Sequence, residues 1–141
     1  FCDFSSDDCG LWLNTTMGGI CQPRPESCTT GGPGACGCDG TYQTNACELQ
    51  SAGTDHQKYG GCLEPESTSD FRCGDTSCSP DTEHCSISMN DVVGDNEPEF
   101  YSNCAPLETE CAQGDCSCVQ LDFASECFNI NGYTFVINAG G

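Results

Sequence analysis

The sequence has very few basic side chains. Lys and Arg together account for 3 of its 141 residues, against 22 Asp and Glu, which gives a formal net charge of −19. Nucleic acids and anionic membrane surfaces are bound through clustered Lys and Arg. The composition therefore argues against both as partners. Apolar runs are also short, and none approaches the roughly 18–20 residues of a membrane-spanning helix, so we expect no insertion into a membrane.

Groups that commonly carry catalysis or bind transition metals are scarce as well. His56 and His84 are the only histidines, and His84 adjoins Cys85, for which a disulfide is the simpler role. The sequence has no Cys-x-x-Cys pair of the kind that zinc sites use, and no Cys-x-x-Cys-His haem motif. Carboxylate pairs can serve in glycoside hydrolysis, but nothing singles out one pair among 22 acids. We therefore expect no enzymatic activity.

Cysteine, in contrast, is abundant, with 16 residues in the chain. A content above roughly 8–10% in a short chain indicates a disulfide scaffold, in which cross-links replace much of the hydrophobic core. Hydrophobic residues make up only 36% even with cysteine included. The number of cysteines is even, so every thiol can be paired. We infer an oxidising compartment and a secreted protein, either extracellular or held at the cell surface.

A Cys-free stretch rich in Pro, Ser, Thr and acid divides the cysteines evenly, with eight on each side. Three spacings recur in the same order in the two halves, which predicts an internal duplication. They are Cys2-x6-Cys9 with Cys78-x6-Cys85, Cys21-x6-Cys28 with Cys104-x6-Cys111, and Cys36-x-Cys38-x8-Cys47 with Cys116-x-Cys118-x8-Cys127. We expect a first module with an N-terminal extension over residues 1–62, a linker over 63–72, and a divergent second module over 73–141.

Local signals predict few regular elements. An Asn at the cap position, a Glu three residues later and a Gly stop predict a helix over residues 45–52. Residues 122–127 are the equivalent segment of the second half. The Asn131-Gly132 turn signal is followed by a β-prone run over Tyr133–Ile137, the clearest strand in the sequence.

Residues 21–62 carry the spacing of a known family. Cys28-x7-Cys36-Gly-x-Asp39-Gly40 is followed by Asn45-x-Cys47-Glu-Leu. This pattern resembles the Kazal family of serine-protease inhibitors, and its Cys-Gly-Cys-Asp-Gly variant looks most like Kazal-type modules of secreted myxobacterial proteins. The second half shares only the cysteine skeleton. The expected fold class is therefore a small disulfide-rich α+β protein, with two tandem Kazal-like modules of short helices, short strands and long loops.

The resemblance also implies disulfides. In the first module they are Cys28–Cys47 and Cys36–Cys62, and by duplication the second module has Cys111–Cys127 and Cys73–Cys116. The family's fifth cysteine would fall at Gln50, so Cys38 is the expected partner of Cys21. The pairs that remain are Cys2–Cys9, Cys78–Cys85 and Cys104–Cys118, and sequence does not determine this last part of the connectivity.

By the same resemblance, the specificity residue of an inhibitor would be Thr30, with Thr29 before it and Gly31 after it. Inhibition needs a stiff loop, because rigidity removes the ordering cost of binding. Three glycines among residues 31–34 predict a flexible loop instead, and the aromatic support at Thr41-Tyr42 comes one position early. A Kazal-type inhibitor with a serine protease as partner is therefore the alternative function, not the favoured one.

Calcium is the cofactor that the sequence makes conceivable. One loop gathers hard oxygen ligands of the kind that Ca²⁺ prefers, at Asp91, Asp95, Asn96, Glu97 and Glu99. The loop lacks the alternating ligands of an EF-hand, and a solvated acidic loop is the plainer interpretation. A second alternative function is thus an acidic, cation-dependent surface-binding module. Asn14 begins the N-x-Thr sequon of the chain, a possible glycosylation site.

The C-terminal segment leads to the favoured function. It is uncharged after Glu126, and Tyr133, Phe135, Val136 and Ile137 make it strongly β-prone. Such a strand either completes a sheet in its own module or adds to a neighbouring subunit. The favoured hypothesis is a non-catalytic secreted structural or interaction protein that binds itself or another extracellular protein. Its C-terminal strand would carry the contact in an extracellular filament or surface layer.

Overall fold

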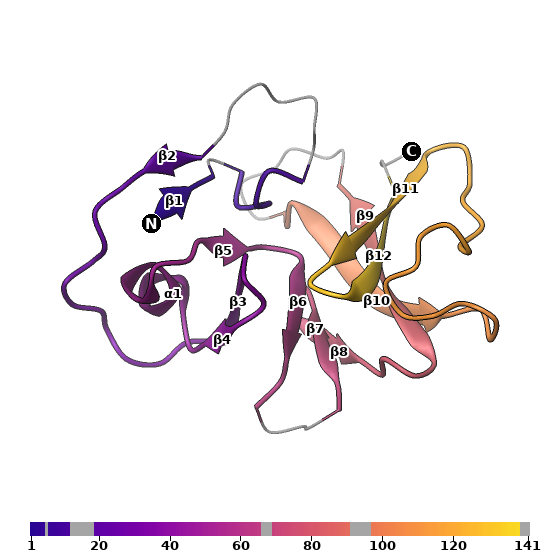
Figure 1. Ribbon diagram of the computed structural model, residues 1–141, viewed down its shortest axis with the longest axis horizontal. Coiled ribbons are helices and arrows are strands. Elements are labelled where there is room, and N and C mark those ends of the chain that lie inside the picture. The colour runs from indigo at the N-terminus through magenta and orange to yellow at the C-terminus, as the bar shows by residue number, and fades with distance from the viewer. Residues whose placement is uncertain (5, 12–18, 66–68, 91–96, 139–141) are drawn as a thin grey trace.

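The computed structural model describes residues 1–4, 6–11, 19–65, 69–90 and 97–138 (Figure 1). In chain order these residues form β1 (Cys2–Asp3), β2 (Ile20–Cys21), β3 (Ala35–Gly37), β4 (Tyr42–Gln43), α1 (Ala46–Ala52), β5 (His56–Gln57), β6 (Gly60–Leu63), β7 (Phe71–Cys73), β8 (Thr76–Cys78), β9 (Glu83–Met89), β10 (Phe100–Pro106), β11 (Ser125–Ile130) and β12 (Tyr133–Asn138). They build four sheets, ordered β1-β2, β4-β3-β5, β6-β7-β8 and β10-β9-β12-β11.

The fold is mostly β-sheet, so the expected α+β class with several short helices is wrong. Strands make up 39% of the described residues and helix 6%, with one short helix among them. The segment expected to be helical in the second half, residues 122–127, runs instead from a turn into β11. Cys127 pairs there with Val136 of β12. Pairing with a strongly β-prone neighbour overrides the weak helical tendency of this segment.

Helix α1 forms where its capping residues indicate. The Asn45 side chain accepts a hydrogen bond from the Glu48 N–H at 2.9 Å, which satisfies one of the free donors at the helix start. Gly53 ends the helix in the left-handed region, with φ at 101°. Leu49 is fully buried beneath Gly37 of β3, where an added Cβ would lie 3.2 Å from the Leu49 side chain. This contact packs α1 against the small sheet of the first half.

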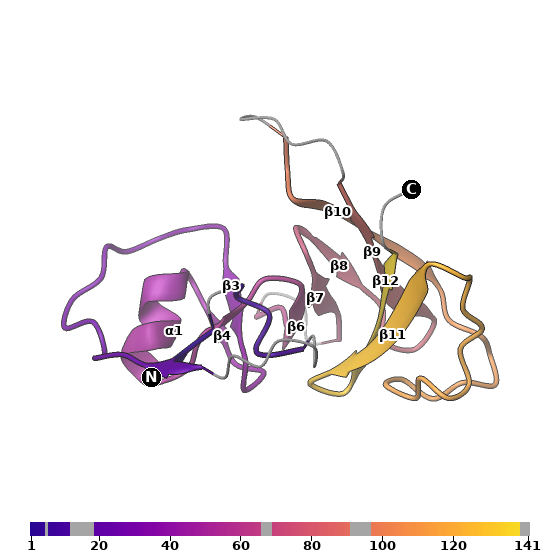
Figure 2. The same ribbon diagram turned by 90° about the horizontal axis from the view of Figure 1, so that it is seen from above.

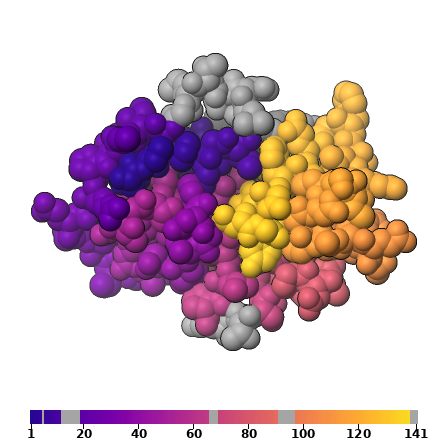
Figure 3. Space-filling model, viewed as in Figure 1, coloured from indigo at the N-terminus to yellow at the C-terminus, as the bar shows by residue number. Residues whose placement is uncertain are grey.

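The main hydrophobic core joins the two halves of the chain. Tyr59 from the first half is buried together with Phe71 and Phe135 from the second. The Phe71 and Tyr133 rings stack with their centroids 4.4 Å apart. The two ends of the expected linker are strands, since β6 and β7 pair antiparallel on either side of residues 64–70. The halves accordingly lie in close contact (Figure 3).

Seven disulfides cross-link the described cysteines: Cys9–Cys38, Cys28–Cys47, Cys36–Cys62, Cys73–Cys85, Cys78–Cys104, Cys111–Cys118 and Cys116–Cys127. Cys28–Cys47 and Cys36–Cys62 are the pairs that the Kazal resemblance implies. The other expected pairs differ from the structure and are corrected: Cys2–Cys9, Cys21–Cys38, Cys73–Cys116, Cys78–Cys85, Cys104–Cys118 and Cys111–Cys127. Cys2 and Cys21 are free.

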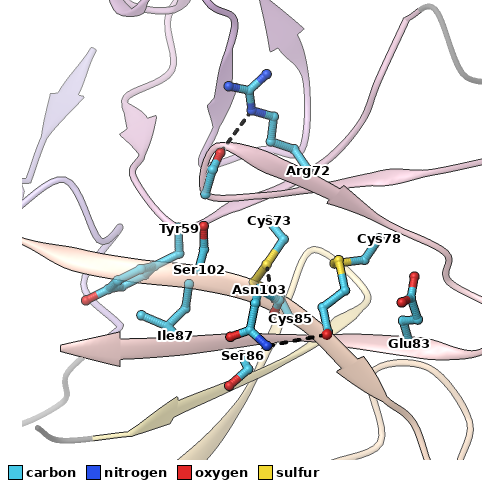
Figure 4. Close-up of a disulfide and its surroundings, with 12 residues drawn as sticks. Tyr59, Arg72, Cys73, Cys78, Glu83, Cys85, Ser86, Ile87, Ser102 and Asn103 are labelled. Carbon is cyan, nitrogen blue, oxygen red and sulfur yellow. Dashed lines mark hydrogen bonds between the residues drawn. A yellow bond between two sulfur atoms is a disulfide. The ribbon is translucent and has the colours of Figure 1, made fainter. Parts of the chain in front are cut away.

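The second-half disulfides follow from its sheets rather than from the repeated spacing. Cys73–Cys85 links β7 to β9 inside the core, close to Tyr59 and Ile87 (Figure 4). Cys78–Cys104 links β8 to β10 in the same way. Both disulfides join the β6-β7-β8 sheet to the β10-β9-β12-β11 sheet, although equal spacing suggested a copy of the first module. The recurring spacings therefore do not correspond to a repeated disulfide pattern.

Strand β12 lies inside the four-stranded sheet. It pairs parallel with β9 and antiparallel with β11, so both of its edges are occupied. Phe135 and Ile137 are no more than 1% exposed, and Val136 is also buried. Phe135, Val136 and Ile137, expected to carry an assembly contact together with Tyr133, are therefore covered within this chain. The strand completes a sheet within its own half, the other possibility that the sequence left open.

The tip of the β11–β12 hairpin docks on the first half. Asn131 and Gly132 form its two-residue turn with positive φ angles of 54° and 96°, as the Asn-Gly signal predicts. The Asn131 side-chain amide donates to the carbonyl oxygens of Gly61 at 3.1 Å and Gly37 at 3.4 Å. One turn residue thereby ties the C-terminal sheet to the small sheet of the first half.

Candidate functional site

The connection between β2 and β3 presents the residues at which a Kazal-like inhibitor would meet its protease. It arches beside α1 (Figure 2). Thr29, Thr30 and Gly31 are exposed within it. The Cys28–Cys47 disulfide attaches the start of this loop to α1.

One asparagine braces the loop on both sides of Thr30. The Asn45 Nδ2 group donates to the carbonyl oxygen of Thr29 and to that of Gly31, each at 2.9 Å. The Oδ1 atom of the same amide caps α1 through the Glu48 N–H. Thr30 thus lies between two peptide groups that are anchored to a helix terminus. The sequence analysis identified Asn45 as a helix cap and as part of the Kazal-like pattern, but not as a brace of the loop.

Two further contacts hold the end of the loop. The Gly34 N–H donates to the Thr44 carbonyl at 3.1 Å, and the Arg72 guanidinium donates to the Pro33 carbonyl at 2.9 Å. Gly34, with φ at 97°, lies directly against the Tyr42 ring, so close that an added Cβ would collide with the phenol. Tyr42 therefore contacts the loop even though it comes one position early in the sequence, because the glycine lets the backbone approach the ring closely.

The structure describes two of the five expected calcium ligands of the acidic loop, Glu97 and Glu99. Asp91, Asp95 and Asn96 lie outside the described residues, as does Asn14 of the glycosylation sequon. Glu97 accepts a hydrogen bond from the Tyr101 hydroxyl at 3.3 Å. Glu99 forms an ion pair with Lys58 at 2.6 Å. Each of the two glutamates is therefore already engaged with a neighbouring side chain.

A cleft of about 540 Å³ lies beside this ion pair, between β5 and β10. Lys58, Glu99 and Phe100 line it together with Asp75 and Ser102. The Ser102 hydroxyl donates to Asp75 at 2.9 Å, so these polar groups are paired with one another. His56 lines the same cleft.

The structure also gathers three carboxylates that sequence reasoning did not connect. Asp3, Asp7 and Asp55 place one oxygen each within 4.8 Å of one another. Asp55 is 2% exposed, and its Oδ1 atom has no hydrogen-bond partner. The pKa of Asp7 is raised, first by its partial burial and then by the charge of Asp55. Asp55 is about 50 residues from the other two in the chain, so no local motif announced the group.

The chain was compared with protein families, curated proteins and solved structures. In the described residues no helix is long and apolar enough to cross a membrane, and the seven disulfides indicate an extracellular or secreted protein. None of the three comparisons found a match, whether to a family model, a curated protein or a solved structure.

Proposed function

We propose that this protein is a secreted, non-catalytic inhibitor of serine proteases, which presents Thr30 to an enzyme that accepts small side chains. The observation that carries the proposal is the pair of hydrogen bonds from Asn45 to the carbonyls of Thr29 and Gly31. They brace the backbone on both sides of an exposed residue. Two disulfides of the Kazal pattern, Cys28–Cys47 and Cys36–Cys62, support the same interpretation.

The braced loop is suited to bind a protease as a substrate does. An exposed segment that is already ordered loses little conformational entropy when it enters an active site. Thr30 would occupy the primary specificity pocket, and its small side chain fits elastase-like or subtilisin-like enzymes. Selectivity among proteases follows from the shape and charge of this pocket.

The same contacts explain why such a loop would resist turnover. If the protease cleaves the peptide bond after Thr30, Asn45 still holds the carbonyls of Thr29 and Gly31. The Cys28–Cys47 disulfide keeps the first fragment on α1, and the Pro33 and Gly34 contacts keep the second one in place. The new ends then stay close together, which favours resealing over release because of their high effective concentration.

Self-assembly into a filament or surface layer is not proposed. The strand that was expected to carry it, β12, is paired on both edges and its apolar side chains are buried. Strand addition at this position would require the β9–β12 or β11–β12 pairing to break first.

The direct test is a titration of the purified protein against elastase-like, subtilisin-like and trypsin-like proteases. We expect the first two to be inhibited and the last to be unaffected. The Thr30→Lys variant should gain inhibition of the trypsin-like enzyme, because a lysine suits its acidic specificity pocket. Thr109→Lys is the matched control, since Thr109 is an exposed threonine outside the loop. Absence of inhibition at micromolar protein by both the wild type and Thr30→Lys would refute the proposal.

A second variant separates loop bracing from helix capping. Asn45→Asp keeps an oxygen for the Glu48 N–H but removes the two donors to the loop carbonyls. Loss of two hydrogen bonds should weaken inhibition by about 10- to 100-fold. The melting temperature should change little, because the cap is retained. Unchanged inhibition in this variant would show that the brace has no part in binding.

A further inference from the structure

The N-terminal segment meets the first half of the protein at a cluster of negative charge. Asp3 lies in β1, Asp7 in the turn that follows, and Asp55 just before β5. The segment is fixed to this region by the Phe4 N–H, which donates to Asp55 Oδ2 at 2.7 Å, and by the Lys58 N–H, which donates to the Asp7 carbonyl at 2.8 Å. Three carboxylates are thereby held within 4.8 Å of one another.

Asp55 provides independent evidence that this cluster lacks a partner for one of its carboxylate oxygens. Its side chain is 2% exposed, and one of its oxygens, Oδ1, is buried without a hydrogen-bond donor. A buried carboxylate oxygen without a partner destabilises the folded state, because it loses its hydrogen bonds to water and forms none within the protein. Such groups in folded proteins call for an explanation, of which an ion is one.

The local positive charge only partly balances the three acids. Lys58 and His56 attract the negative charge of Asp7, whereas Asp55 and Asp3 repel it. Lys58 is moreover engaged with Glu99 at 2.6 Å. The cluster therefore retains like-charge repulsion that a bound cation would relieve.

We propose that Asp3, Asp7 and Asp55 bind a divalent cation of the calcium class. The donor set is made of carboxylate oxygens, which are hard ligands and suit Ca²⁺ rather than the nitrogen- and sulfur-preferring metals. Asp55 supplies a buried anchor through Oδ1, and the half-buried Asp3 and Asp7 leave room for water among the remaining ligands. Among the described residues, the three ligands come from segments other than the loop around Thr30.

A bound cation would join the N-terminal segment to the rest of the first half. Asp3 and Asp7 belong to the N-terminal segment, and Asp55 belongs to the body next to β5. Figure 1 shows β1 beside β5. The Cys9–Cys38 disulfide already joins the same two parts a few residues away. A cation would add a second clamp nearer to the N-terminus. It would fix β1 and the following turn against the first half, and so act on stability rather than on the exposed loop.

The test uses the fully oxidised protein, freed of metal with a chelator and then titrated with CaCl₂. Calorimetry should detect saturable binding of one ion, and the melting temperature should rise above that in NaCl of equal ionic strength. Asp3→Asn and Asp7→Asn should each weaken Ca²⁺ binding by about tenfold or more, because the charge and number of ligands set the affinity. Asp81→Asn, at an exposed aspartate far from the cluster in the chain, is the matched control and should behave as the wild type.

The melting temperature of Asp7→Asn without metal distinguishes loss of the ion from simple misfolding. In the presence of chelator Asp7→Asn should melt at or above the wild-type temperature, since it removes repulsion. In Ca²⁺ it should melt below the wild type. An equal rise in melting temperature for all four proteins would indicate screening of the net charge and would overturn the proposal. So would a response to CaCl₂ no larger than that to NaCl.

Discussion

Cys2 and Cys21 face each other across the β1–β2 ribbon, and both are exposed and free. Phe1 and Gln22, the next residues along the ribbon, exchange both backbone hydrogen bonds, at 2.8 and 2.9 Å. Cys2 and Cys21 are therefore a non-hydrogen-bonded pair, whose Cα atoms typically lie about 4.5 Å apart, within disulfide range. The Cys2 sulfur lies over Gly19, two residues before Cys21, so a side-chain rotation would bring it towards its partner.

We predict an eighth disulfide between Cys2 and Cys21 in the secreted protein. The two thiols would lose their protons and two electrons to a disulfide oxidant of the secretory compartment, which is itself reduced to thiols. A thiol assay in denaturant should find no free cysteine, and a non-reducing peptide map should recover the Cys2–Cys21 link. Two reactive thiols per chain would contradict the prediction.

Removal of this link has a measurable cost. A disulfide that closes a loop of about 20 residues stabilises a protein by about 3 kcal/mol in the chain-entropy model. The double variant Cys2→Ser/Cys21→Ser should therefore lower the free energy of unfolding by about that amount in denaturant titrations. The wild type measured after selective reduction of the pair should match the double variant. Equal stability of the oxidised wild type and the variant would mean that the link is absent.

Local sequence signals predicted those elements that depend on neighbouring residues. The cap at Asn45 and the stop at Gly53 located α1, and the Asn131-Gly132 turn located the start of β12. The sheet order was not predictable in this way. The parallel pairing of β12 with β9 joins residues about 50 positions apart, and it decides that β12 is an inner strand.

The candidate sites show the same difference between features set by neighbouring residues and features set by distant ones. The candidate loop at Thr30 followed from cysteine spacing, and its brace from Asn45 required the folded backbone to be seen. The disulfides of the second half depended on which strands pair, so equal spacing gave the wrong connectivity. The carboxylate cluster joins Asp3 and Asp55 across most of the first half. No pattern confined to a short stretch could indicate it.

The contact between Gly34 and Tyr42 makes the loop sensitive to one methyl group. Gly34→Ala places a side chain at a φ of 97° and against the Tyr42 phenol. We expect a loss of about 1–3 kcal/mol in stability and a comparable loss in inhibition, because the end of the loop must move. Gly31→Ala is the matched control, with a φ of 92° but open space around an added Cβ. Equal stability losses in the two variants would show that backbone strain causes the loss and that the Tyr42 contact does not.

The hairpin tip at Asn131 should contribute to the association of the two halves. Asn131→Asp tolerates the same left-handed backbone but removes the donors to the Gly61 and Gly37 carbonyls. We expect the free energy of unfolding to fall by about 1–3 kcal/mol, because two hydrogen bonds are lost, although the Gly37 carbonyl still accepts from the Gly40 N–H. Asn129→Asp changes the same hairpin at a residue whose amide donates to Gly114 within the second half. A smaller loss in Asn129→Asp would locate the effect at the contact between the halves.

His84 makes stability depend on pH. Burial lowers the pKa of His84 below its ordinary value of 6.5, although a backbone hydrogen bond with Pro106 opposes the shift, and its Nδ1 atom is buried without a partner. A histidine whose folded pKa is depressed stabilises the protein above the unfolded value of 6.5, and this contribution is lost as the pH falls towards the folded pKa. Denaturant titrations from pH 7.5 downwards should show a falling stability that His84→Gln largely removes. Parallel profiles for the wild type and His84→Gln would show that another group binds the proton.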